Sequence, residues 1–175
     1  MTNKTTKAIF LDRDGTIIWD KNYLASPSDI EYYPDTLSAL KLMIQKGYKL
    51  YIITNQSGVG RGYFTLKTVE EIHRVIDQDL ISQGLPAFSG WGICPHAPDE
   101  FCSCRKPSPQ LILEFIKKDK IDPKKSWMVG DKLIDAECGI KASIQGALVR
   151  ENSLSQTKEY PFYKTLLEFA QSLAE

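Results

Sequence analysis

Short apolar runs separated by amphipathic stretches recur along the whole chain. An uninterrupted apolar run of about four to eight residues is typical of a strand buried on both faces. The run at residues 8–11 reads A-I-F-L and stops abruptly at an acidic turn. Four further runs predict strands of the same kind, at residues 48–53, 88–94, 126–129 and 146–149.

The stretches between these runs predict helices, because their apolar residues return every three or four positions. Pro34 opens the first helix and Gly47 ends it. Thr65 is expected to cap a long helix that runs to Gln83 and stops at Gly84. Further helices are predicted from Ser108 or Pro109 onward, at residues 135–142 and at residues 162–173.

Strand and helix alternate from one end of the chain to the other, which indicates a parallel sheet with helices on both faces. Residues 17–33 and 95–107 show neither period, so we expect a flap and an irregular loop there. No repeat or linker interrupts the alternation. We therefore predict an α/β fold with a Rossmann-like, doubly wound parallel sheet, in a single domain over residues 1–175.

Charge and polarity narrow the possible partners. The chain has 22 basic and 22 acidic residues, so no net field draws it toward nucleic acid or a membrane surface. The first residues, M-T-N-K-T-T-K, are polar and do not form a signal peptide, and no apolar run approaches a membrane span. We expect a soluble cytoplasmic protein, monomeric by default, without nucleic-acid or membrane partners.

Polar residues follow three of the predicted strands at the point where each strand ends. Asp12 and Asp14 come after the first strand, Thr54 after the second and Asp131 after the fourth. The carboxyl ends of parallel strands meet at one edge of a sheet, so these side chains should converge there, with Lys106 at the start of the next helix. Three acids, a hydroxyl and an amine suit Mg²⁺ and a phosphoryl group. Taken alone, D-R-D-G would equally fit an ordinary acidic turn.

Three of the four cysteines lie close together in the predicted loop. Cys94, His96, Cys102 and Cys104 offer three thiolates and one imidazole, a set suited to tetrahedral Zn²⁺. The pairs lack the usual two-residue gap, and reduced cysteines beside a surface histidine are the alternative. With no open ligand position, the zinc would be structural and would stiffen the loop that leads to Lys106.

Four motifs, in order, resemble those of the haloacid dehalogenase-like (HAD) phosphatases: D-R-D-G-T at residues 12–16, Thr54, Lys106, and G-D at residues 130–131. The resemblance implies that Asp12 attacks phosphorus to form an aspartyl-phosphate, and that Asp14 is the general acid and then the general base. It also implies that Asp12, the Asp14 carbonyl and Asp131 hold Mg²⁺, while Thr54 and Lys106 bind phosphoryl oxygens. Asp135 either orients Asp131 or is a charge at a helix start.

The loop C-P-H…C-x-C-R-K-P and the stretch T-N-Q-S-G-V-G-R-G-Y-F resemble a narrower group. It contains the D-glycero-D-manno-heptose 1,7-bisphosphate phosphatases and the histidinol-phosphate phosphatases. Residues 20–24, 54–64 and 130–133 are more similar to the heptose branch. Ile18 stands where that branch usually carries Asn, and the short gap inside the cysteine loop is similar to the histidinol branch. We predict hydrolysis of the 7-phosphate of the heptose bisphosphate, a small phosphorylated sugar, with histidinol phosphate as the alternative substrate.

The same resemblance implies the substrate contacts. Arg105 is the best candidate for binding a second phosphate at the far end of a bisphosphate, because its bidentate fork matches that group; a solvated loop charge is the alternative. Trp19 and Tyr23 would line the opening or only pack the flap. The predicted substrate contacts are Arg13, Asp20, Lys21, Asn22, Tyr23, Thr54, Asn55, Gln56, Ser57, Arg105, Lys106 and Lys132.

The spacing of the motifs predicts a capless enzyme. The residues between Asp14 and Thr54, and those between Thr54 and Lys106, are already occupied by predicted strands, helices and loops. A separate cap domain needs roughly fifty residues to itself. The flap and the cysteine loop should therefore set the specificity of an open site.

Other functions fit parts of the pattern. A polynucleotide 3′-phosphatase shares T-N-Q-x-G-x-G-R-G but lacks the cysteine loop, and a neutral chain offers no field for a nucleic-acid backbone. A receiver-like phosphoacceptor domain would not need a general acid such as Asp14 beside its phosphorylated aspartate. A degenerate zinc-binding module would leave the acids and the lysine unexplained.

Overall fold

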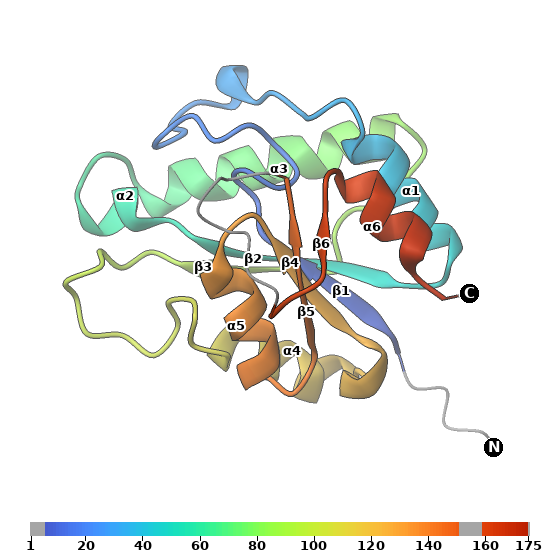
Figure 1. Ribbon diagram of the computed structural model, residues 1–175. Helices are drawn as coiled ribbons and strands as arrows, with labels where there is room; N and C mark the ends of the chain where they lie inside the picture. The colour runs from blue at the N-terminus through green and yellow to red at the C-terminus, as the bar shows by residue number, and fades with distance from the viewer. Residues whose placement is uncertain (1–5, 151–158, 175) are drawn as a thin grey trace.

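Six parallel strands form one sheet in the order β3-β2-β1-β4-β5-β6 (Figure 1). The structure, a computed structural model, describes residues 6–150 and 159–174, so the polar first residues used above lie outside it. The strands are β1 (Ala8–Leu11), β2 (Lys49–Asn55), β3 (Gly90–Cys94), β4 (Trp127–Gly130), β5 (Gln145–Val149) and β6 (Phe162–Tyr163).

Helices cover both faces of the sheet, as the alternation predicts. Figure 1 shows α1, α3 and α6 on one face and α4 and α5 on the other. The helices are α1 (Thr36–Gln45), α2 (Ser57–Gly60), α3 (Leu66–Ser82), α4 (Gln110–Asp119), α5 (Leu133–Lys141) and α6 (Leu166–Ser172), with 3₁₀ turns η1 (Pro27–Asp29) and η2 (Pro123–Lys125).

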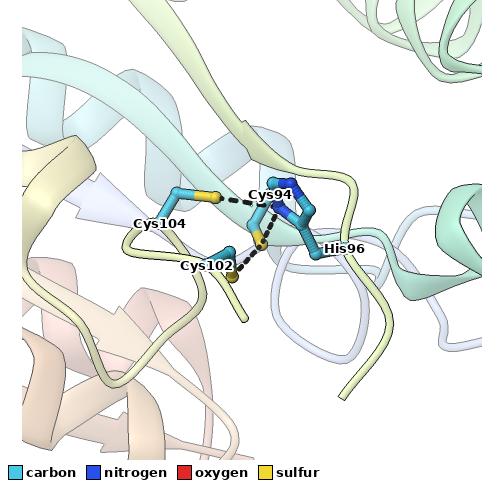
Figure 2. Close-up of side chains that lie close together, drawn as sticks. All are labelled: Cys94, His96, Cys102 and Cys104. Atoms are coloured by element: carbon cyan, nitrogen blue, oxygen red, sulfur yellow. Dashed lines mark hydrogen bonds between the residues drawn. The ribbon is translucent and has the colours of Figure 1, made fainter. Parts of the chain in front are cut away.

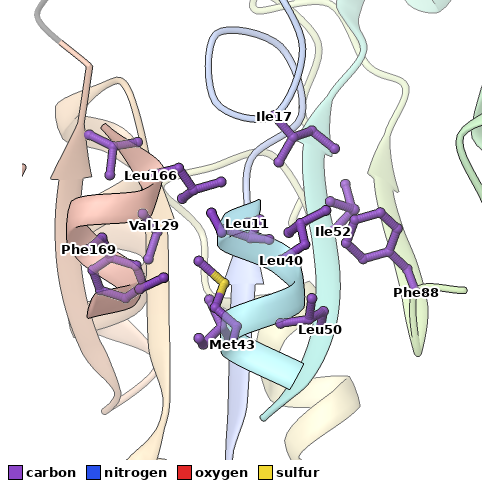
Figure 3. Close-up of a cluster of buried hydrophobic side chains, with 14 of the residues drawn as sticks. Leu11, Ile17, Leu40, Met43, Leu50, Ile52, Phe88, Val129, Leu166 and Phe169 are labelled. Carbon is purple, nitrogen blue, oxygen red and sulfur yellow. The ribbon is translucent and has the colours of Figure 1, made fainter. Parts of the chain in front are cut away.

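Strand β1 lies in the middle of the sheet and is buried on both faces. Its residues alternate between two apolar clusters: Ile9 and Leu11 join the cluster under α1, α3 and α6, and Ala8 and Phe10 join the one under α4 and α5. Figure 3 shows Leu11 in the first cluster, among side chains from α1, α6 and the neighbouring strands. Burial of each large apolar side chain stabilises the fold by about 1.5–3 kcal/mol. The acidic turn after β1 is therefore attached to a rigid support.

The prediction of one helix over residues 162–173 is wrong in its first part. Phe162 and Tyr163 pair in parallel with Leu148 and Val149 and form β6, a strand too short to show a period in the sequence. Helix α6 begins only after Thr165, whose side chain accepts a hydrogen bond from the backbone N–H of Glu168 at 3.1 Å. Helix α5 begins two residues earlier than predicted, and the short α2 was not predicted.

The segments between strands agree with the prediction of a capless fold. Between β1 and β3, the described chain contains the flap with η1, then α1, β2, α2 and α3, and no further folded unit. The irregular loop runs from the end of β3 to α4. None of the described helices is long and apolar enough to cross a membrane.

Candidate active site

The order of the central strands brings the polar strand ends together. Strand β1 lies between β2 and β4, so Asp12 follows the middle strand, with Thr54 on one side and Asp131 on the other. Carboxylate oxygens of Asp12, Asp131 and Asp135 lie within 4.8 Å of one another. Residues separated by more than one hundred positions thus form one acidic cluster.

Lys106 is buried against two acids of this cluster, with 3% of its surface exposed. Its Nζ lies 2.6 Å from Asp12 Oδ1 and 2.7 Å from Asp135 Oδ1, and donates to the Ile53 carbonyl at 2.8 Å. Burial alone would lower the pKa of Lys106, but the two carboxylates outweigh burial and raise it. The lysine is therefore a fixed positive charge beside the Asp12 carboxylate.

The cluster keeps a negative charge that suits a divalent cation. Three carboxylates and the buried ammonium sum to −2, and the more exposed Lys132 lies at 4.0 Å from Asp131 Oδ2. Burial, and then the neighbouring Asp12, raise the pKa of Asp131 to about 7, and Lys132 acts in the opposite direction. Gly15 has φ of +82°, and a Cβ there would lie 2.5 Å from Asp131 Oδ2, so a glycine is needed for the aspartate to lie against the D-R-D-G turn. Buried, closely spaced carboxylate oxygens are the donor set that Mg²⁺ prefers.

Asp135 is held by two partners in the first turn of α5. Its Oδ2 accepts a hydrogen bond from the backbone N–H of Lys132 at 3.0 Å, and its Oδ1 is the second acid on Lys106. Asp135 is thus both a charge at a helix start, one of the two predicted roles, and a support for the buried lysine. Both of its oxygens already have protein partners.

Asp14 lies beside Asp12 but has different partners. Arg13 donates two hydrogen bonds to its carboxylate, from Nε to Oδ2 at 2.9 Å and from Nη2 to Oδ1 at 3.1 Å. Gln56 donates from Nε2 to Asp14 Oδ2 at 2.9 Å and to Thr54 Oγ1 at 2.7 Å. Arg13 is 1% exposed, and its guanidinium donates to Asp14 and Gln56, so most of its N–H groups already have protein partners.

A cleft of about 230 Å³ opens over these groups. It is lined by most of the predicted contacts, and Leu24, Gly58, Ile134 and Asp135 complete the wall. Lys21 does not line it; its Nζ pairs with Glu31 at 2.5 Å, and both side chains are exposed. The predicted contacts in the wall are Arg13, Asp20, Asn22, Tyr23, Thr54, Asn55, Gln56, Ser57, Arg105, Lys106 and Lys132.

The aromatic residues of the flap divide between the two roles considered for them. Tyr23 lines the cleft and packs edge-on against Tyr63, with ring centroids 4.9 Å apart. Trp19 packs on Tyr33, with centroids 4.1 Å apart, and does not line the cleft. Asp20 and Lys132, both in the cleft wall, form an ion pair at 3.5 Å between Oδ2 and Nζ.

The irregular loop is attached to the active site by its last residues. Asn55, at the end of β2, accepts a hydrogen bond from the Lys106 backbone N–H at 3.0 Å and donates to its carbonyl at 3.3 Å. Arg105 lines the cleft while its Nη1 donates to the His96 carbonyl at 3.3 Å. Asn55 therefore fixes the backbone of the lysine.

The loop brings Cys94, His96, Cys102 and Cys104 into one cluster, shown in Figure 2. Cys94 Sγ lies 3.8 Å from Cys102 Sγ and 3.6 Å from His96 Nδ1, and Cys104 Sγ lies 3.3 Å from the same nitrogen. A tetrahedron with Zn–S of about 2.3 Å and Zn–N of about 2.05 Å has edges of roughly 3.8 Å and 3.6 Å between ligands. The four side chains thus fit a zinc ion. Burial raises the pKa of the Cys94 thiol to about 12 in the metal-free protein, so metal binding would release protons.

Some residues of the cleft left no signal in the sequence. Leu24 and Ile134 are apolar residues that the pattern assigns equally to a core. Gly58 lies in a glycine-rich stretch that predicts a turn, and its place in the wall depends on the fold around it. Nothing in their local sequence could have indicated a cleft.

Comparison with known proteins gives consistent matches. A family model described as HAD-hydrolase-like matches residues 103–175. A D-glycero-beta-D-manno-heptose-1,7-bisphosphate 7-phosphatase of Helicobacter pylori (strain ATCC 700392 / 26695) is 42% identical over 83% of this chain and 84% of its own. A D-glycero-alpha-D-manno-heptose-1,7-bisphosphate 7-phosphatase of Photorhabdus laumondii is 39% identical over 82% of both chains. A crystal structure of D,D-heptose 1,7-bisphosphate phosphatase from B. bronchiseptica, complexed with magnesium and phosphate, has a TM-score of 0.86 and 28% identity, over 95% of this chain and 97% of that chain.

Proposed function

Because the chain belongs to the HAD-like phosphatases and is a phosphoric monoester hydrolase, we propose that it removes the 7-phosphate of D-glycero-D-manno-heptose 1,7-bisphosphate. The observation that carries this proposal is the position of Arg105 in the cleft that opens over Asp12. One phosphate would meet Asp12 and Lys106, and the Arg105 guanidinium in the cleft wall would supply a fork for a second phosphate. The relatives named for the same substrate support it.

In the proposed reaction, Asp12 attacks phosphorus and forms an aspartyl-phosphate as the sugar oxygen leaves. Lys106, 2.6 Å from Asp12, keeps that carboxylate in place and offers positive charge to the phosphoryl oxygens. Asp14 gives its proton to the leaving oxygen, then takes one from the water that hydrolyses the intermediate. Thr54 would bind a phosphoryl oxygen with its hydroxyl.

Asp12, Asp131 and the backbone carbonyl of Asp14 would hold Mg²⁺, and the ion would neutralise charge on the transferring phosphoryl group. Asp135 is a supporting residue, since Lys106 and the Lys132 backbone already occupy its oxygens. Cys94, His96, Cys102 and Cys104 would hold a structural Zn²⁺, which keeps the loop in the shape that presents Arg105 and Lys106.

One of the two features that favoured histidinol phosphate loses its weight in the structure. Ile18 is fully buried, belongs to the apolar cluster under α1 and forms backbone bridges with Asp14 and Tyr32. Its side chain therefore belongs to the core and is not part of the wall that would contact substrate. The short cysteine loop is the remaining feature on that side.

The proposal is tested by Mg²⁺-dependent phosphate release from both anomers of the heptose bisphosphate, from histidinol phosphate and from a 3′-phosphorylated oligonucleotide. We expect kcat/KM for one heptose anomer to exceed the values for histidinol phosphate and the oligonucleotide by about a hundredfold. That ratio equals about 2.7 kcal/mol of differential transition-state binding. Arg105→Ala should lower that preference, whereas the exposed Arg61→Ala, a matched loop arginine outside the cleft, should not. A preference for histidinol phosphate would overturn the assignment.

A further inference from the structure

Asp14 is fixed by a side chain that is almost wholly buried. The guanidinium of Arg13 spans both carboxylate oxygens of Asp14, and its Nη2 also donates to Gln56 Oε1 at 3.1 Å. Arg13 borders the cleft but is only 1% exposed, so its N–H groups depend on protein acceptors. A buried guanidinium has five N–H groups to satisfy, and each one left without an acceptor is costly.

His73 supplies the acceptor on the far side of Arg13. It comes from α3, is 4% exposed, and places Nε2 3.1 Å from Arg13 Nη1. Arginine can only donate, so Nε2 accepts and the proton of the neutral ring is on Nδ1. Burial, and then the charge of Arg13, lower the pKa of His73 to about 3, which agrees with a neutral ring at neutral pH.

The ring of His73 is itself held in one orientation. It stacks on Trp91 of β3, with ring centroids 3.8 Å apart and planes 15° apart. The indole Nε1 of Trp91 donates to Asp77 Oδ2 at 3.0 Å, and Asp77 is one turn further along α3. The chain of contacts therefore runs from a helix on the face of the sheet, through His73 and Arg13, to Asp14.

We propose that His73 is a positioning residue for the acid–base step: by accepting from Arg13 it keeps the Arg13 fork, and so the Asp14 carboxyl, aimed at the leaving oxygen. This inference rests on the role proposed above for Asp14. A side chain that only filled space on α3 would have no need of a nitrogen directed at the guanidinium. Leucine at this position would pack equally well and leave Arg13 Nη1 without its partner.

The test compares two esters that differ in their need for an acid. An alkyl phosphate expels a strongly basic oxygen that must be protonated, whereas 4-nitrophenyl phosphate expels a stable phenolate that need not be. The alkyl ester is heptose 1,7-bisphosphate, or histidinol phosphate if the wild type prefers it. We measure kcat/KM, which reports the steps up to formation of the aspartyl-phosphate, for wild type, His73→Leu, His73→Gln and Asp14→Asn.

We expect His73→Leu to lose about tenfold in kcat/KM on the alkyl ester and less than about twofold on the aryl ester, as befits one hydrogen bond to a charged group. His73→Gln, whose amide oxygen can replace Nε2 as acceptor, should restore the alkyl rate to within about threefold. Leu80→Ala, a buried change two turns along α3, should lower Tm and leave the ratio between the esters unchanged. Should His73→Leu not fold, His73→Met serves as the second variant without a strong acceptor.

The outcomes distinguish the proposed role of His73 from the proposed role of Asp14. Suppose that Asp14→Asn lowers kcat/KM more for the alkyl ester than for the aryl ester, whereas His73→Leu lowers both equally or lowers neither. The positioning role of His73 is then overturned, and the proposed role of Asp14 stands. If Asp14→Asn itself lowers both esters equally, the acid role of Asp14 is overturned, and the inference about His73 with it. If Asp14→Asn and His73→Leu both lose more kcat/KM on the alkyl ester than on the aryl ester, and His73→Gln restores the alkyl rate, both proposed roles are supported.

Discussion

The acidic cluster and the thiol cluster place potential metal ligands together by opposite means. Asp12, Lys106 and Asp131 come from distant parts of the chain and meet because β1 lies between β2 and β4. Cys94 and Cys104 meet through a single loop. The acids have a buried ammonium beside them, whereas the thiols contact one another, His96 and backbone groups of their own loop. The first cluster is organised by the sheet, and the second would depend on its ion.

The largest effect should come from removing the one oxygen that forms a covalent bond. Asp12→Asn should lower kcat by about a thousandfold or more, because the amide is no nucleophile, while Tm and zinc content stay near wild type. Steady-state kinetics with metal analysis of the same sample measure both. More than about a thousandth of the wild-type rate would contradict covalent catalysis by Asp12.

Removal of the buried ammonium should damage both activity and stability. Lys106→Met leaves Asp12 and Asp135 facing each other without a cation, which should cost about 3–5 kcal/mol of unfolding free energy. Lys132→Met breaks an exposed pair with Asp20 and should cost less than about 1 kcal/mol. Urea unfolding of the two variants makes the comparison. Equal losses would mean that the acids do not depend on Lys106.

Loss of the zinc ion should have a smaller and more local effect. We expect about one equivalent of zinc per chain, and Cys102→Ala should lower that content and the Tm, since the loop loses a ligand that its own contacts do not replace. Activity should fall by about tenfold through Lys106 and Arg105, far less than for Asp12→Asn. Cys138→Ala, a thiol outside the cluster, is the control. A zinc-free protein with full activity and Tm would rule out the structural site.

The smallest effect concerns pH and the buried imidazole. The folded pKa of His73 is about 3, below its ordinary value of 6.5, so only the unfolded chain takes up this proton as pH falls between the two. Stability from this group is thus complete above pH 6.5 and lost progressively toward pH 3, by about 1.4 kcal/mol per pH unit. Between pH 7.5 and 5.0, wild type should lose about 2 kcal/mol more than His73→Gln in urea unfolding. An equal loss of unfolding free energy in both proteins would mean that the folded and unfolded chains protonate this ring over the same pH range.

The sequence predicted the potential metal ligands of both regions but not the contacts that support the acidic one. The strand ends and the cysteine loop were visible because motif residues follow strong apolar runs or lie close together in the chain. The roles of Arg13 and Gln56 were not, because nothing local distinguishes a buried fork from a substrate contact. His73 lies on the apolar face of α3 with Ile72 and Ile76, where a histidine is indistinguishable from a core residue. Strand β6 was missed because two residues show no period.

The close approach of Gly15 to Asp131 has a consequence for experiments that survey every position. Gly130 is constrained in the same way, because a Cβ there would collide with the carboxylate of Asp135. In a saturation mutagenesis screen, both glycines should tolerate no replacement and score beside Asp12 as essential, although neither has a side chain to contribute. The positions that tolerate no substitution would therefore include glycines required for steric reasons as well as residues required for chemistry. Only an assay that compares several substrates would distinguish the two groups.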